Sequence, residues 1–65
     1  MTYDQLKQKL RELADKNQKF DIEDTAACMG VSSFILRKTC EILNINVYVD
    51  GKTDFFCGYK KEFKG

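Results

Sequence analysis

Apolar residues recur at helical spacing at the start of the chain, with charged residues between them. The apolar positions are Tyr3, Leu6, Leu10, Leu13 and Ala14. They fall on one face of a helix, which predicts an amphipathic helix over residues 2–16. Thr2 is placed to cap this helix, with Gln5 completing a capping box, and Met1 and Leu6 are placed to form a hydrophobic staple around the cap.

A second helix is predicted over residues 21–29, after one isolated apolar residue. Phe20 follows a polar connector, and we expect it to form a one-residue strand. The helix opens with carboxylates at Asp21, Glu23 and Asp24, where unpaired backbone N–H groups and the helix dipole favour negative charge. We interpret these acids as a helix cap in preference to a metal or catalytic site, because no His joins them.

The third predicted helix, over residues 32–43, follows a tight turn. Gly30 suits a turn with positive φ, and Ser32 is placed as the N-cap. Leu36, Cys40 and Leu43 form the expected buried stripe. The expected outward residues are Ser33, Phe34, Arg37, Lys38 and Glu41, with Ile35 and Ile42 at the margin. The spacing of Ala26, Gly30 and Leu36 is typical of a helix-turn-helix, and Phe34 is unusual on an outward face.

The remainder of the chain changes to the two-residue period of a β-hairpin, predicted over residues 45–59. Ile45, Val47 and Val49 alternate with other residues before a turn signal at Asp50 and Gly51. A loop over residues 50–52 would place Val49, Val47 and Ile45 opposite Thr53, Phe55 and Cys57, whereas a two-residue turn would place Val47 opposite Asp54. We favour the longer loop, because register follows the buried pattern. Residues 60–65 form a short basic tail.

Length and composition restrict the chemistry that this chain can perform. The 65 residues contain no His, no Trp and no Pro, and the only Cys residues are Cys28, Cys40 and Cys57, in no metal-binding spacing. We read the cysteines as reduced thiols, with Cys40 in a helix core and Cys57 in a strand. No pair of groups supplies a nucleophile and a base, so we expect no enzyme activity, no cofactor and no small-molecule substrate. Without a membrane span or signal peptide, we expect a cytoplasmic protein.

Charge is nearly balanced over the whole chain but is unevenly distributed. Residues 1–19 hold five basic and three acidic side chains, for a net charge of +2. Residues 20–45 hold two basic and four acidic side chains, for −2, and residues 46–65 hold four and three, for +1. The basic charge therefore lies toward the two ends of the chain.

The element order and the stretch FDIEDTAACMGVSSFILRKTCEILN, followed by VYVDGKTDFF, resemble the winged helix-turn-helix family over nearly the whole chain. The resemblance implies a mainly α fold with a small β-hairpin, in which a three-helix core is followed by a wing. The whole chain, residues 1–65, would form this single domain. The sequence departs from the family at Thr25 and Thr39, where larger aliphatic residues are usual.

The resemblance also implies that the third helix enters the major groove of double-stranded DNA. The side chains nearest to DNA would be Ser33, Phe34, Arg37 and Lys38. Ser32, Ser33 and the helix N-terminus are suited to donate to a phosphate, Arg37 to read guanine, and Phe34 to touch thymine methyl groups. Lys52 at the wing tip would touch the DNA backbone or the minor groove. The basic tail residues Lys60, Lys61 and Lys64 would add salt-sensitive affinity that does not depend on sequence.

Two functions remain open at this point. The first is a small DNA-binding protein, a transcription regulator or an excisionase-like architectural factor, acting as a homodimer or with a protein partner because one module contacts few base pairs. The second is a protein-protein interaction module, such as a phage-type effector, that uses Phe34 and Ile35, with Ile42 beside them, as hydrophobic anchors.

Overall fold

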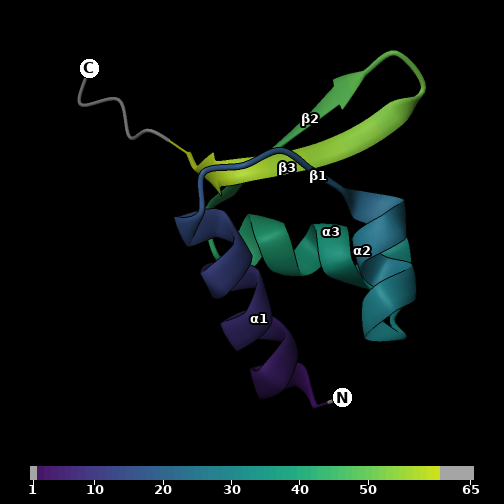
Figure 1. The fold of residues 1–65 in the computed structure, drawn as a ribbon. Helices are drawn as coiled ribbons and strands as arrows, with labels where there is room; N and C mark the ends of the chain where they lie inside the picture. The colour runs from purple at the N-terminus through teal and green to yellow at the C-terminus, as the bar shows by residue number, and fades with distance from the viewer. Residues whose placement is uncertain (1, 61–65) are drawn as a thin grey trace.

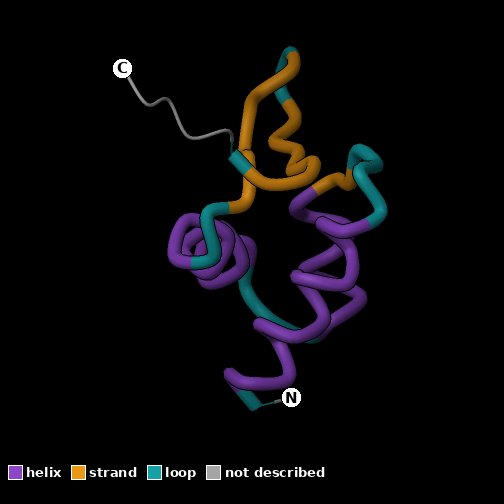
Figure 2. The backbone as a smooth tube through the Cα atoms, turned by 90° about the vertical axis from the view of Figure 1, so that its left-hand side faces the viewer, coloured by secondary structure: helices purple, strands orange, loops and turns teal. Residues whose placement is uncertain are grey.

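A computed structural model describes residues 2–60 and shows helices in the predicted places. Within this range the helices are α1 (Tyr3–Asp15), α2 (Ile22–Met29) and α3 (Ser33–Ile42), and the strands are β1 (Phe20–Asp21), β2 (Ile45–Asp50) and β3 (Thr53–Tyr59). The helices lie along one side of the sheet, and the tip of the β2–β3 hairpin extends away from them (Figures 1 and 2). This arrangement fits a winged helix, which is the fold class that the sequence predicted.

Each helix begins at the capping residue that the sequence indicates. The hydroxyl of Thr2 accepts from the backbone N–H of Gln5 (3.2 Å), and the Gln5 side chain accepts from the backbone N–H of Thr2 (2.9 Å). Asp21 accepts from the backbone of the first turn of α2, so its carboxylate serves as a cap. The side chain of Ser32 caps α3, and Gly30 ends α2 in the left-handed conformation. The proposed staple involves Met1, which lies outside the described residues.

The sheet is antiparallel with the strand order β1-β3-β2, so β3 is central. The expected one-residue strand at Phe20 is a two-residue strand, and Phe20 lies opposite Phe56 in β3. The two rings stack with centroids 5.3 Å apart. This contact fastens the α1–α2 connector to the middle of the hairpin.

The predicted hairpin register is wrong by one residue. Asp50 pairs with Thr53 and Tyr48 pairs with Phe55, so the turn contains only Gly51 and Lys52. Val47 consequently lies opposite Phe56, which neither of the two registers considered from the sequence provides. A shift of one residue turns a strand over, and here it directs Phe56 to the core and Phe55 to the opposite face. The alternating pattern alone could not choose between two adjacent phenylalanines.

A bulge interrupts the regular pairing of the hairpin near the end of β3. Ile45 pairs with Tyr59 while Val47 pairs with Phe56, so β3 contains one residue more than β2 between these pairs. Gly58 lies in this bulge with a φ of 60°, a conformation that residues other than glycine adopt at a cost. Ile45 of β2 and Phe56 of β3, on either side of the bulge, are both fully buried.

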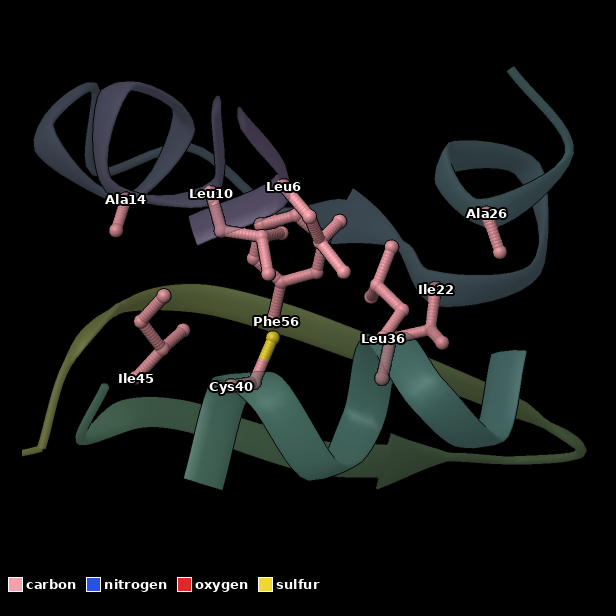
Figure 3. Close-up of a cluster of buried hydrophobic side chains, with 9 residues drawn as sticks. All are labelled: Leu6, Leu10, Ala14, Ile22, Ala26, Leu36, Cys40, Ile45 and Phe56. Carbon is pink, nitrogen blue, oxygen red and sulfur yellow. The ribbon is translucent and has the colours of Figure 1, made fainter. Parts of the chain in front are cut away.

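Phe56 lies at the centre of the hydrophobic core. Figure 3 shows its ring near Leu6 and Leu10 of α1, with the sulfur of Cys40 directed toward it from α3. The buried hydrophobic residues are Leu6, Leu10, Ala14, Ile22, Ala26, Leu36, Cys40, Ile45 and Phe56. The prediction for α3 is confirmed at Leu36 and Cys40, whereas Leu43 is only half-buried. Thr39 is buried as well, and its hydroxyl donates to the carbonyl of Ile35 (2.8 Å).

Replacing Phe56 by alanine is expected to destabilise the protein by about 3–5 kcal/mol, because the variant loses apolar burial and leaves a cavity. Phe34→Ala is the matched control, since 63% of Phe34 is exposed. Its effect should stay within about 0.5 kcal/mol. Urea unfolding followed by circular dichroism measures both, and equal losses for the two variants would contradict the central position of Phe56.

Gly58→Ala is expected to destabilise the protein by more than Gly51→Ala. Both glycines have positive φ, but a Cβ at Gly58 would lie 2.7 Å from Oδ1 of Asn17, while one at Gly51 meets nothing within 4 Å. The backbone strain of about 1–2 kcal/mol is common to both variants. Adding Asn17→Gly should recover part of the loss in Gly58→Ala. The melting temperatures of the unmodified protein, the two alanine variants and the double variant test this prediction. Identical melting temperatures for Gly58→Ala and Gly51→Ala would contradict it.

Candidate nucleic-acid interface

The outer face of α3 carries the side chains that the sequence singled out. Phe34 is 63% exposed and Ile35 45% exposed, and Arg37 and Lys38 are exposed beside them. Ile42, expected at the margin, is 67% exposed. The outward face is therefore more apolar than predicted, with isoleucine side chains flanking the two basic residues.

The N-terminus of α3 is partly occupied by its own cap. The Ser32 hydroxyl accepts from the backbone N–H of Ile35 (3.1 Å), so Ser32 already serves the helix. Ser33 is half-buried. Because the first N–H groups of a helix have no carbonyl partner within it, the backbone N–H groups of Ser33 and Phe34 are suited to an anionic group. The side chain of Ser32 thus caps α3, whereas the backbone N–H groups are the donors suited to a phosphate.

The basic side chains of α3 each have a carboxylate neighbour. The guanidinium of Arg37 forms an ion pair with Asp54 of β3, which connects the helix to the wing. Nζ of Lys38 lies 3.8 Å from a carboxylate oxygen of Glu41 and 5.6 Å from the centroid of the Phe34 ring. The pairing makes this part of the surface nearly neutral.

A lysine from the α1–α2 connector stiffens the wing. Nζ of Lys19 donates to the carboxylate of Asp50 (3.1 Å) and lies 4.0 Å from the centroid of the Phe55 ring. The Phe55 ring in turn lies 5.9 Å from that of Tyr48 on the neighbouring strand. These contacts hold the base of the turn in which Lys52 is exposed. Lys52 therefore extends from a supported hairpin.

Lys60 lies at the other end of β3. Its backbone N–H donates to the carbonyl of Asn44 (2.8 Å), and the side-chain amide of Asn44 donates back to the carbonyl of Lys60 (3.4 Å). The seven residues of β3 separate Lys60 from Lys52, and the chain between the two lysines spans about 26–27 Å at 3.2–3.4 Å per residue. The structure consequently divides the predicted cations between two ends of the sheet. Lys61 and Lys64 lie outside the described residues.

Sequence reasoning did not identify Asp54, Asp50 or Lys19 as parts of this site. Asp54 lies 17 positions from Arg37, and Lys19 lies 31 positions from Asp50. No spacing rule connects residues at such separations. The charge balance of the hairpin, which alternates Asp50, Lys52 and Asp54, was the one available indication.

A groove of about 360 Å³ lies between α1, β1 and α2, away from the predicted DNA-binding residues. Its lining is mostly apolar and consists of Lys9, Leu13, Phe20, Asp24, Thr25, Cys28 and Met29. Among residues 2–60 there is no group of three or more His, Cys, Asp or Glu side chains able to hold a metal ion. Nor is any helix in this range both long and apolar enough to cross a membrane.

The cysteines occupy three different environments. Cys28 is exposed, Cys57 is half-buried and Cys40 is fully buried, and all are free thiols. The positions expected for Cys40 in the helix core and Cys57 in a strand are confirmed. Burial raises the pKa of the Cys40 thiol from 9.0 to about 11. Cys40 is thus a core side chain that resists ionisation.

Comparison of the chain with protein-family models, with curated proteins and with solved structures finds no match. The residues of this chain and their geometry are therefore the basis for assigning a function.

The raised pKa of Cys40 predicts a loss of stability at high pH. The unfolded chain releases this proton near pH 9.0, while the folded protein retains it until about pH 11. The group therefore leaves stability unchanged below pH 9 and lowers it by about 2–3 kcal/mol as the pH rises through this window. Urea unfolding between pH 8 and 11 measures this loss in the free energy of unfolding, with Cys40→Ala as the control. Parallel pH profiles for the two proteins would contradict the prediction.

Proposed function

We propose that this protein binds double-stranded DNA, with α3 in the major groove and the β2–β3 hairpin against the backbone. The observation that carries the proposal is the winged-helix arrangement of an exposed α3 face bearing Arg37 and Lys38 beside a supported hairpin bearing Lys52. An α-helix fits the major groove, and basic residues on a wing are suited to phosphates. The protein would act as a transcription regulator or an excisionase-like architectural factor.

The carboxylates near these cations weaken DNA binding without preventing it. An exposed ion pair such as that of Lys38 and Glu41 contributes only about 0–1 kcal/mol. A phosphate can therefore replace the carboxylate as the partner of the lysine. Each phosphate contact contributes about 0.9 to the slope of log K against log salt concentration. The near-neutral surface leads us to expect modest affinity and a shallow slope for a single copy.

A single domain of this size contacts too few base pairs for useful sequence specificity. We therefore propose that it acts as a homodimer or together with a protein partner, so that two modules read neighbouring half-sites. The mass of the protein in solution, with and without DNA, distinguishes the two arrangements.

The exposed apolar residues of α3 favour a second candidate function. Phe34, Ile35 and Ile42 expose large side chains on one helix, and the nearby basic residues are neutralised by acids. Exposed aromatic and aliphatic clusters of this kind mark protein interfaces. In this alternative the winged helix is a protein-protein interaction module, for example a phage-type effector, with Phe34 as its anchor.

The double variant Arg37→Ala/Lys38→Ala is expected to lower DNA affinity at least about ten-fold. The slope of log K against log salt concentration should also become shallower, because two cations are lost. Fluorescence anisotropy measures this with a random-sequence duplex and a genomic fragment pool at low and moderate salt. Arg11→Ala/Lys16→Ala is the matched control, since it removes the same charge from α1 and its C-cap residue and should retain most of the affinity.

Phe34→Ser separates the two functions. If the protein binds DNA, this variant should keep the salt slope of the unmodified protein, because it changes no charge. If α3 is instead a protein interface, Phe34→Ser should abolish capture of the partner, and the Arg37/Lys38 variant should retain it. Absence of binding to any duplex at low salt would refute the DNA proposal.

A further inference from the structure

The ion pair between Arg37 and Asp54 joins the outer face of α3 to the central strand of the sheet. It is the contact by which a predicted DNA-reading side chain meets the wing. The other α3 cation, Lys38, pairs instead with Glu41 one turn away on its own helix. The two basic residues of α3 are therefore held in different ways.

Asp54 is the more firmly fixed partner of the pair. Its side chain is 22% exposed, against 46% for that of Arg37. Its neighbours in β3 are paired on both sides, Thr53 with Asp50 and Phe55 with Tyr48. The carboxylate thus extends from a backbone that is hydrogen-bonded into the sheet, and the flexible arginine adjusts to it.

The chemistry of the guanidinium leaves it able to bind a second partner. Arg carries five N–H donors in a planar fork, and one carboxylate occupies at most one edge of it. With nearly half of the Arg37 side chain exposed, the remaining donors are accessible. An arginine already held in one orientation loses less conformational freedom when it binds the O6 and N7 acceptors of guanine.

We propose that Asp54 is a positioning residue that holds Arg37 for bidentate reading of one guanine, and so sets sequence preference. The proposal rests on the proposed DNA-binding function. Lys38, whose partner lies on the same exposed helix face, contributes affinity that does not depend on sequence. Asp54, which lies near the tip of the wing, thus decreases general attraction to DNA and increases discrimination between sequences.

Asp54→Asn tests this assignment, with Glu41→Gln as the matched control. Each variant replaces one carboxylate beside an α3 cation with an amide of nearly the same shape.

Sites are first selected from a randomised duplex pool by the unmodified protein. Anisotropy then gives the ratio of affinities for the selected duplex and for one with the preferred guanine replaced. Asp54→Asn should reduce this ratio about ten-fold, while its affinity for random duplex stays equal or rises. Glu41→Gln should leave the ratio unchanged.

Three outcomes overturn the assignment, and they are distinguishable from one another. If both variants change binding to all duplexes by the same factor, Asp54 acts only through its charge. If the unmodified protein binds duplex DNA but selects no guanine, DNA binding stands and the positioning role fails. If the unmodified protein binds no duplex at low salt, the proposed function and this inference fail together.

A second variant keeps the test valid if Asp54→Asn does not fold, which circular dichroism would reveal. Arg37→Lys retains the charge but lacks the fork needed for bidentate contact. We expect it to lose the preference for guanine by a similar factor while keeping the salt slope of the unmodified protein. Retained preference in Arg37→Lys would overturn the inference.

Discussion

Burial of the Phe56 ring is the constraint on which the rest of the structure depends. In a domain of 65 residues the hydrophobic core is small, and Phe56 is the largest side chain that is fully buried in it. The ring stacks on Phe20 from β1 and lies near leucines of α1 and the thiol of Cys40 in α3. One side chain from the central strand therefore brings the helices and the sheet together.

The orientation of Phe56 also determines what the wing presents to its surroundings. Because side chains alternate along a strand, directing Phe56 inward places Asp54 on the same face of β3 and Phe55 on the other. Asp54 then meets Arg37 of α3, and Phe55 meets Lys19 of the connector. A register shifted by one residue would exchange these faces and break both contacts. Core packing and surface chemistry are thus coupled through one strand.

The parts of the fold that sequence predicted correctly are those with local causes. Thr2, Asp21 and Ser32 cap helices through side chains that reach backbone N–H groups two or three residues away, so their positions could be read directly. The hairpin register could not, because Phe55 and Phe56 both fit an alternating pattern and only the assembled core selects one. The same reason explains why Arg37 was placed correctly on the surface while its partner Asp54, 17 positions along the chain, was missed.

The paired charges of α3 and the wing affect how any partner can bind. A ligand that approaches Arg37 or Lys38 must compete with a carboxylate already in place, so attraction at long range is weak and binding depends on contacts made at short range. The exposed apolar side chains of Phe34 and Ile42 are available for contacts of this kind. Because a small core leaves little stability in reserve, a partner that binds only the folded state would also raise the free energy of unfolding. We therefore expect recognition and folding to be linked in this protein, through the helix that contributes both Cys40 to the core and Phe34 to the surface.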